Sequence, residues 1–429
     1  MTQSALSTNF SGMAKEVYTT DGILNLIPES KILTGLIPFA TGERVGLAFN
    51  FPVQTTTENG RSFAPAGYIP PVAATSTFTT QNAVVTPYQV MLVSTLDYDT
   101  HFRAHEAGKA AFASATEMQM RVMAESAVKT TEIQMIYGQD FLARVSACSA
   151  STSPAVLTVS AGEWAPGIWA GFEGCPLDFW EGSSTLANTN ASLIVSSVDP
   201  VNKTITVTGN NTDIAAINTY VASNPGTGGV VFYGSGQTTR GDQEMFGLKV
   251  IISNTGSIFG INAASYSLWK GNTYSASSAA LTFAKIQTAI AQLVGRGLNE
   301  KVTFFINPVT WANLLTDQAS LRMYDSSYSE ASVELGSKSI RFHSQNGELE
   351  IVSHIFVKEG DAFAFPTKRA KRIGSTDWTL GIPGAPDSNG AVIIQSPTNG
   401  SFSYRMYTSQ QVFLEKPATS LYINNIVNS

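Results

Sequence analysis

The sequence predicts an α+β fold in which an extended arm and a hairpin come first, one long helix follows, and β-rich sequence fills most of the rest. Proline, glycine, threonine and aromatic residues dominate residues 35–90, and no lysine occurs between Lys31 and Lys109. Residues 97–138 then contain no proline and a single internal glycine, Gly108, which is typical of a helix. A first hundred residues without a core of their own indicate a chain that reaches across its neighbours.

The composition indicates a globular protein with a weakly charged surface. Of the 429 residues, 43% are hydrophobic and 14% are charged, whereas about 25% charged residues is usual. A neutral polar surface suits a protein that buries much of itself against other copies, because each buried unpaired charge is costly. The net charge of −6 argues against nucleic-acid binding as the main task, since phosphate binding leaves a basic footprint.

Neither a secretory signal nor a membrane segment is predicted. The start of the chain lacks a basic end followed by an apolar run, and no apolar stretch reaches the roughly 18 residues of a membrane helix. Cys148 and Cys175 are the only cysteines, which is too few for a four-ligand zinc site. We expect both to be free, buried thiols in a reducing compartment.

The first two predicted segments are an arm and a long hairpin. Residues 1–43 are polar and small at first and are then broken by prolines, so we assign them to an N-terminal arm. Residues 44–96 are predicted to make a two-stranded excursion, and the strong turn signal Asn59-Gly60 puts its tip near Asn59. The interior of this excursion is too rich in proline and glycine to be a normal sheet.

Residues 97–140 are predicted to form a spine helix. Asp97 or Asp99 can cap its start, and Gly138 stands where a C-cap glycine is expected. A helix of about 40 residues is about 60 Å long, so both of its ends should be packed. Its apolar stripe recurs at steps of three and four residues and consists of Ala104, Ala107, Ala111, Ala115, Met118 and Val122.

Residues 141–246 are predicted to be an inserted small all-β domain. Short apolar runs alternate with tight turns, and residues 199–202 form the loop of a hairpin. The GTGG sequence at 226–229 precedes a strand rather than a helix, so it indicates a turn and not a phosphate loop. The expected core of the insertion is Trp164, Trp169, Phe172 and Leu177.

Residues 247–390 are predicted to form an α+β body. The segment 281–297 is an amphipathic helix, residues 302–306 are a buried strand, and a second helix follows Pro308. Further strands turn on Asn-Gly pairs, and residues 391–429 are predicted to be the C-terminal strands.

Residues that could carry catalysis or bind a metal are sparse. His101 and His105 have the i, i+4 spacing of a shared metal site, but the glutamate of the metalloprotease motif is missing. His343 and His354 are expected on a hairpin, facing outward or into a contact. No nucleophile elbow, P-loop or complete dinucleotide motif occurs. We therefore expect no enzyme activity, no cofactor and no metal site.

The order of elements resembles the major capsid proteins of tailed bacteriophages. Three segments carry this resemblance: FFINPVTWANLL (304–315), the hairpin IRFHSQNGELEIVSHIFVKEGDAFAFP (340–366), and MYTSQQVFLEKPATSLYINNI (406–426). The resemblance implies that the spine helix and long strands form a peripheral domain, to which residues 391–429 return. It also implies that residues 247–390 form an axial domain, and that the hairpin lies over a neighbouring subunit.

The function implied by the resemblance is that of a structural subunit of a phage head. Pentamers and hexamers of the chain would close an icosahedral shell around double-stranded DNA, without sequence-specific binding and without a membrane. The shell would assemble in the bacterial host cytoplasm and become the virion capsid. A separate scaffold protein, a portal and decoration proteins are implied partners. The alternatives are a cargo-enclosing bacterial nanocompartment shell, a tail or baseplate protein and, last, an enzyme.

Two groups of residues are predicted to make contacts between subunits. The hairpin carries no lysine, which excludes on the loop side the lysine–asparagine cross-link that some members of this family form. The basic cluster near residue 370 is expected to pair with acidic residues of neighbours, such as Glu43, Glu58 or Asp325, and contact with packaged DNA is its alternative. The predicted contact residues are Asn59, Gly60, Arg61, Phe63, Lys368, Arg369, Lys371 and Arg372.

Overall fold

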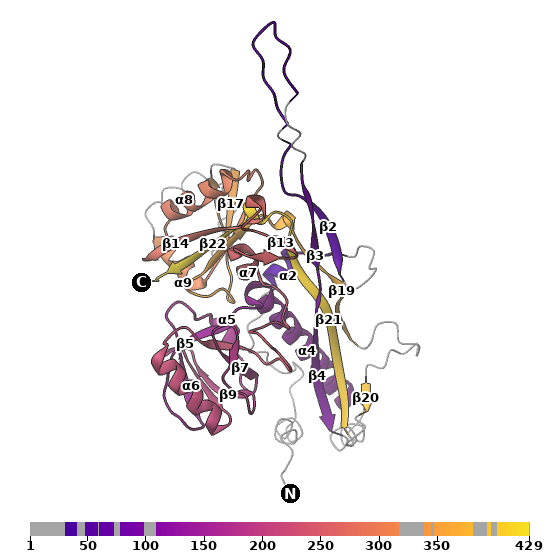
Figure 1. Ribbon diagram of the computed structural model, residues 1–429. Helices are drawn as coiled ribbons and strands as arrows, with labels where there is room; N and C mark the ends of the chain where they lie inside the picture. The colour runs from indigo at the N-terminus through magenta and orange to yellow at the C-terminus, as the bar shows by residue number, and fades with distance from the viewer. Residues whose placement is uncertain are drawn as a thin grey trace, which may run out of the picture.

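The computed structural model shows a body of three packed parts from which a long hairpin projects (Figure 1). The parts are a long sheet with the spine helix, a six-stranded sheet with helices on both faces, and a closed barrel. The structure describes residues 31–40, 48–58, 60–72, 78–97, 109–316, 339–344, 347–380, 393–395 and 401–428.

The long sheet runs beside the spine helix α4 (Lys109–Tyr137). Strand β21 (Ser401–Leu414) forms its centre and pairs along its length with β4 (Tyr88–Asp97). On its other edge β21 pairs with β19 (Ala370–Leu380) and β20 (Ile393–Gln395), and β1 (Phe39–Ala40) extends the sheet beyond β19. A small apolar cluster holds the helix on the sheet and is formed by Met123, Ala127, Tyr404 and Met406.

The six-stranded sheet has helices on both faces. Alternate side chains of its central strand β15 (Val302–Ile306) point to opposite faces, as strand geometry requires. Phe304 joins a core with α8 (Phe283–Val294), whereas Phe305 joins a core with α7 (Leu248–Ser253) and the end of α4. The order is β14 (Asn272–Ala279), β22 (Leu421–Ile426), β18 (Ala362–Phe365), β15, β17 (Gly347–Ser353) and β16 (Ser339–Ser344).

The barrel lies within residues 143–232 and encloses its own core. Strand β11 (Gly229–Phe232) pairs with both β5 (Ala143–Cys148) and β7 (Pro176–Glu181), so six of the seven strands close on themselves. Closure leaves these strands without open edges. The other strands are β6 (Ala155–Val159), β8 (Thr185–Leu186), β9 (Leu193–Asp199) and β10 (Thr204–Thr208).

The prediction that this segment is all-β is wrong, because it contains the helix α6 (Asn211–Ser223). The side chain of Asn210 caps the helix by accepting the Thr212 N–H at 2.8 Å. Ile214, Ile217 and Val221 then bury one face. The predicted core residues of the segment are indeed buried, with Trp164 stacked on Trp169. That the segment is an insertion stays a prediction.

The two predicted caps of the spine helix have different outcomes. Asp97 cannot cap it, because Asp97 is the last residue of β4, and Asp99 lies outside the described residues. Gly138 does follow the helix directly, but the left-handed residue is Gln139, at φ 61°. Glycine is needed at 138 for another reason: a Cβ there would lie 2.1 Å from the Met245 carbonyl oxygen.

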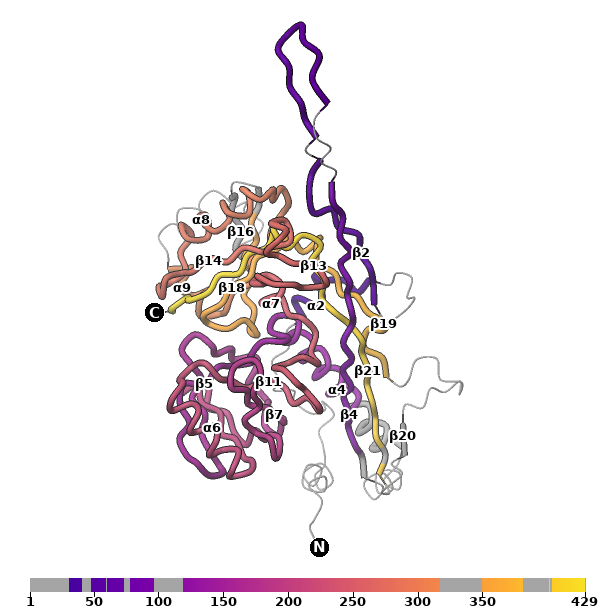
Figure 2. Tube along the Cα trace, in the orientation of Figure 1, coloured from indigo at the N-terminus to yellow at the C-terminus, as the bar shows by residue number. Residues whose placement is uncertain are grey.

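The C-terminal strands do not stay together. Strand β21 belongs to the long sheet, as predicted for residues returning to the peripheral side, but β22 joins the six-stranded sheet by pairing with β14 and β18. Conversely β19, predicted within the axial body, pairs with β21 in the long sheet. The chain therefore crosses between the two sheets twice after residue 365, and Figure 2 shows the long yellow trace of β21 running beside β4 in the long sheet.

The hairpin begins as the two-stranded ribbon β2 (Phe49–Gln54) and β3 (Thr80–Val85). Its described turn is at Pro65–Tyr68, where the Tyr68 N–H donates to the Pro65 carbonyl at 3.0 Å. The predicted tip near Asn59 is therefore misplaced, and Asn59 itself lies outside the described residues. Short elements complete the fold: α2 (Ile32–Leu36), α5 (Pro166–Trp169), α9 (Pro308–Thr316), β12 (Ser257–Ile258), β13 (Ile261–Asn262) and 3-10 turns at Ser267–Trp269, Thr367–Arg369 and Pro417–Thr419.

Candidate functional site

The base of the hairpin is fixed to the body. Ala83 and Val85 of β3 are fully buried, and the Phe51 ring of β2 stacks on Phe413 of β21 at 4.9 Å. The Val84 N–H donates to the Phe259 carbonyl at 2.8 Å. Alternation explains this attachment, because one face of each strand reaches the core while the other faces solvent.

A threonine clasp holds the two strands together where they leave the body. The Thr55 N–H donates to the Thr79 carbonyl at 3.0 Å. The Thr56 hydroxyl lies 2.8 Å from the Thr79 hydroxyl and accepts the Thr79 N–H at 2.7 Å. These bonds give the ribbon a defined direction as it leaves the surface.

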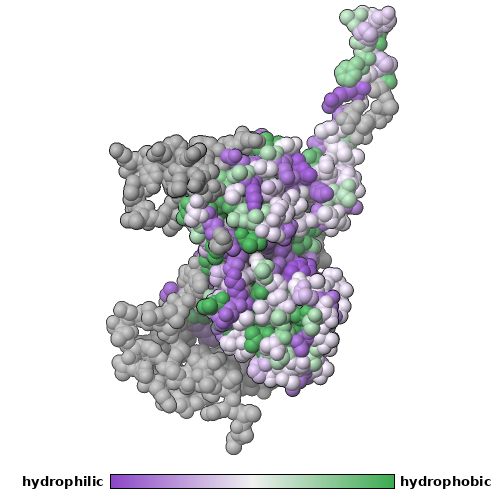
Figure 3. Space-filling model, turned by 90° about the vertical axis from the view of Figure 1, so that its left-hand side faces the viewer, coloured by the Kyte–Doolittle hydropathy of each residue, from purple (hydrophilic) through white to green (hydrophobic). Residues whose placement is uncertain are grey.

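Beyond the clasp, the hairpin presents apolar side chains to solvent. Phe63, Tyr68, Ile69 and Val72 are 87%, 74%, 93% and 98% exposed. Figures 1 and 3 show this part standing clear of the body. Arg61 is the one charged residue among residues 60–72. We call residues 60–72 the arm tip. So many exposed apolar groups on one projection mark an interaction site, and the tip includes three predicted contact residues, Gly60, Arg61 and Phe63.

The basic cluster finds acidic partners within its own chain. Arg369 donates three bonds to Glu300, from Nε at 2.8 Å and 3.2 Å and from Nη2 at 2.5 Å, and a weaker one to Glu415 at 3.4 Å. Lys371 pairs with Glu415 at 2.5 Å. Glu300, beside Arg369, has its pKa lowered by these hydrogen bonds. None of these partners was among the acidic residues named from the sequence.

Arg372 is turned inward and is only 8% exposed. Its Nη1 donates to Asp377 at 3.0 Å and to Gln410 at 3.1 Å, and its Nε donates to the Ile37 carbonyl at 3.1 Å. It thus joins the segment before β1 to the long sheet. A bridge to a neighbouring subunit stays a prediction for the other three residues of the cluster, and Lys368 is the most open of them.

A buried charged network lies where the barrel, the spine helix and the six-stranded sheet meet. Lys249 of α7 pairs with Asp140 at 3.1 Å and with Asp361 at 3.3 Å, and the Tyr422 hydroxyl donates to Asp361 at 2.7 Å. Burial alone would raise the pKa of Asp140, but Lys249, Lys358 and two arginines hold it well below its usual range. Burial alone would lower the pKa of Lys249, but the charges of Asp361 and Asp140 raise it well above its usual value.

Lys358 is the most deeply buried cation of this network. Its side chain is fully buried, and its Nζ donates to the Phe141 carbonyl at 2.9 Å and to Glu163 at 2.5 Å, over the Tyr137 ring at 4.3 Å. Burial lowers the pKa of Lys358 although Glu163 opposes the shift. Lys358 and Lys249 in turn lower the pKa of Glu163 against its burial.

His354 is also internal, so the prediction that it faces outward is wrong. Both His354 and Glu132 are fully buried, and the His354 Nε2 lies 3.0 Å from a Glu132 carboxylate oxygen. The same carboxylate accepts the Thr34 N–H at 2.7 Å and the Leu33 N–H at 3.2 Å. The Phe356 N–H donates to His354 Nδ1, so Nε2 carries the proton and donates to Glu132. The side chain of His343 and all of His101 and His105 lie outside the described residues.

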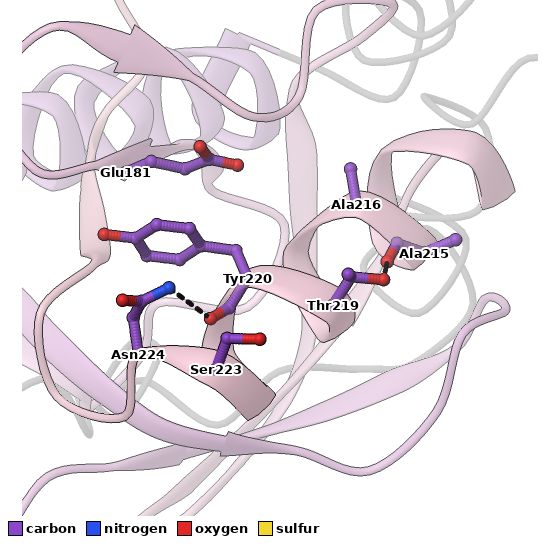
Figure 4. Close-up of a pocket in the computed structure, with 7 residues that line it drawn as sticks. All are labelled: Glu181, Ala215, Ala216, Thr219, Tyr220, Ser223 and Asn224. Carbon is purple, nitrogen blue, oxygen red and sulfur yellow. Dashed lines mark hydrogen bonds between the residues drawn. The ribbon is translucent and has the colours of Figure 1, made fainter.

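A surface groove of about 570 Å³ lies on the barrel, and the residues that line it form no catalytic arrangement. Figure 4 shows Glu181 of β7 facing Tyr220 and the small side chains of α6. The Thr219 hydroxyl donates to the Ala215 carbonyl, and the Asn224 amide donates to the Tyr220 carbonyl, so these groups are engaged within the helix. Glu181 is the only titratable group in the groove besides Tyr220.

The described part of the chain contains no group of three or more potential metal ligands. No helix within it is long and apolar enough to cross a membrane. Cys148 and Cys175 are free thiols, both partly buried, and burial raises the pKa of Cys175 to about 11.

Solved capsid structures are similar to this chain. The capsid asymmetric unit of cyanophage A-1(L) matches with a TM-score of 0.53 at 10% identity, over 95% of this chain and 96% of that one. The capsid of the native GTA particle matches with a TM-score of 0.48 at 9% sequence identity, over 100% of both chains. The capsid asymmetric unit of cyanophage Pam1 matches with a TM-score of 0.42 at 11% identity, over 99% of both chains. The sequence matches no protein-family model and no curated protein. The likeness to the A-1(L) subunit shows that this chain has the fold of a phage capsid subunit, which confirms the resemblance drawn from the order of elements.

Proposed function

We propose that this chain is the major capsid protein of a phage head, and that its copies close an icosahedral shell around double-stranded DNA. The observation that carries the proposal is the likeness in fold to the cyanophage A-1(L) capsid subunit over 95% of the chain. In this account the protein is structural rather than catalytic. It assembles in the bacterial cytoplasm and ends in the virion capsid.

The arm tip is the part that we expect to join subunits. Fully burying a side chain such as Phe63, Ile69 or Val72 is worth about 1.5–3 kcal/mol, and part of this is lost to ordering the arm. Repetition around a closed shell multiplies a modest contact, because each subunit both gives and receives an arm.

The remaining partners follow from the same proposal. Pentamers and hexamers of the chain form the shell, and a separate scaffold, a portal and decoration proteins act with it. The DNA is enclosed without sequence-specific binding, in keeping with the net charge of −6. We place the barrel, as an added domain, on the outer surface, where an added module can be tolerated.

An assembly assay on two matched variants tests the proposal. The double variant Ile69→Ser/Val72→Ser removes apolar surface from the arm tip, and Val201→Ser removes an equally exposed valine, 85% exposed, from the barrel. Light scattering and electron microscopy should show normal shells for the control and a loss of shells at least tenfold for the arm variant. Both variants should keep the circular dichroism of the wild type.

The outcomes also separate the alternatives. Normal shells from the arm variant would contradict the role of the arm. Fibres from the wild type would favour a tail or baseplate protein. Shells that enclose an enzyme instead of DNA would favour a nanocompartment.

A further inference from the structure

Two chain segments connect the barrel covalently to the body, and together we call them the neck. We define the neck as residues 138–141, which lead into the barrel, and residues 240–247, which lead out. The Gly247 N–H donates to the Gly138 carbonyl at 3.0 Å. A Cβ on Gly247 would lie 2.5 Å from the Gly138 nitrogen, so the two segments touch through their backbones and leave no room for side chains.

Three buried polar atoms of the neck make no hydrogen bond with any described residue: Asp242 Oδ1, Glu244 Oε1 and Arg240 Nε. The Glu244 and Arg240 atoms belong to residues four positions apart on the outgoing segment. Glu244 is only 6% exposed. Buried polar atoms are nearly always paired, so an acceptor and a donor left unpaired at one place indicate that a second arrangement of these side chains exists.

In the present arrangement Arg240 is held by the incoming segment. Its Nη2 lies 3.4 Å from Asp140 Oδ1 and donates to the Gln139 carbonyl at 3.3 Å, and its guanidinium lies over the Phe141 ring at 4.3 Å. The Oε2 of Glu244 accepts the Gln139 N–H at 3.2 Å. Arg240 therefore ties the two halves of the neck together.

The charges around Glu244 decide which arrangement it favours. On its own segment Arg240 favours its ionised form, and on the incoming segment Asp140 opposes it. Arg144 of β5 and Lys249 of α7 also pair with Asp140. Further charged groups of the same network are Lys358, Glu163 and Asp361.

We propose that Arg240 is a two-position switch in the neck, which binds Asp140 while Glu244 is protonated and moves to Glu244 when that carboxyl loses its proton to solvent. Burial raises the pKa of Glu244 to about 8, so both positions fall within an accessible range of pH. In the second position the Arg240 Nε donates to Glu244 Oε1, which pairs these two of the three unpaired atoms. The bonds from Arg240 to Asp140 and Gln139 break, and the neck loosens. Asp140 keeps Lys249 as its partner, so the network survives the exchange.

Hydrogen exchange of the full-length protein tests the switch. Protection factors, corrected for intrinsic rates, are compared at about pH 6.5 and pH 9.5 for peptides covering the neck. We expect protection of the Gln139, Glu244 and Gly247 amides to fall at least tenfold in the wild type. It should stay constant in Glu244→Gln, which keeps the shape of the side chain and cannot ionise. Glu181→Gln, which removes a different carboxylate on strand β7 of the barrel, should behave like the wild type.

Equal protection at both pH values in the wild type would overturn the proposal, as would an equal loss in Glu244→Gln. A wild-type structure at pH 9.5 gives a second readout that needs no variant. The Arg240 Nε should lie within about 3.5 Å of Glu244 Oε1, and an Arg240 still bound to Asp140 would also overturn the proposal. These measurements use the free chain, so their outcome is separate from the shell assembly test.

Discussion

Replacing Lys358 with methionine tests whether the buried charged network holds the parts of the body together. The fully buried lysine donates to Phe141 and Glu163, and methionine fills similar space without the charge. Breaking a buried pair by removing one partner costs about 3–5 kcal/mol. Glu163 is 17% exposed and keeps Arg144 at 3.6 Å, so we expect the lower end, about 3 kcal/mol.

Urea unfolding followed by tryptophan fluorescence measures this effect, because Trp164 lies beside the network and its carbonyl accepts the Glu359 N–H at 3.0 Å. At an m-value of about 1–3 kcal/mol/M, the midpoint should fall by roughly 1–3 M. Lys203→Met is the control, since its pair with Glu359 lies at the surface with the lysine 42% exposed and should change stability by less than about 1 kcal/mol. If Lys358→Met unfolds at the midpoint of the control, the network does not stabilise the body.

Four further predictions follow from the same contacts. Gly138→Ala should destabilise the free subunit by about 1–3 kcal/mol in urea unfolding, because the added Cβ would lie 2.1 Å from the Met245 carbonyl oxygen. An unfolding midpoint equal to that of the wild type would contradict this, because the backbone would then have moved apart without cost. Because the pKa of Asp140 is lowered in the folded state, its ionised carboxylate stabilises the fold above about pH 4, and this stabilisation is lost as the pH falls further. Asp140→Asn should therefore flatten the acid side of a plot of urea midpoint against pH, and an unchanged slope would contradict this. Arg372→Ala should lower the melting temperature of the free subunit, whereas Lys368→Ala should leave it unchanged and reduce only shell yield; the reverse pattern would contradict the assignment of Arg372 to the core. Denaturing gels of particles should show one band near 45.7 kDa, since the hairpin has no lysine, and a ladder of multimers would refute this.

Local patterns in the sequence predicted the elements whose signals are short-range. The buried strand at residues 302–306 appears as expected, and an amphipathic helix forms within residues 281–297, because continuous apolar runs and a 3.6-residue period act within one element. The strands on either side of the predicted turn also pair, with Ser344 opposite Gly347. The exposed apolar arm tip could be inferred because proline and glycine there exclude a core.

The features that the sequence patterns do not predict depend on contacts between segments far apart in the chain. His354 looked like a surface residue of a hairpin, yet it meets Glu132, 222 positions earlier. No pattern within either segment records that pairing. The crossing of β22 into the six-stranded sheet likewise depends on β14 and β18. Helix α6 is a different case, because its signals are local: the Asn210 cap and the spacing of its isoleucines are both present in the sequence. The short apolar runs on either side of it nevertheless favour strands.

For the charged residues, too, local patterns are visible in the sequence and contacts between distant segments are not. A cluster of four basic residues was easy to find, but its acidic partners Glu300 and Glu415 are near in space and distant in sequence. The network around Lys358 combines residues from the spine helix, the barrel, α7 and the six-stranded sheet. Single charges spread along a chain do not reveal such a site until the fold brings them together.

Electron cryo-microscopy of the particles formed by the purified full-length chain tests the central claim most directly. The account predicts closed icosahedral shells in which residues 60–72 of each subunit lie on an adjacent subunit and bury Ile69 and Val72. Monomers, fibres, or shells in which each arm tip packs only on its own subunit would contradict it.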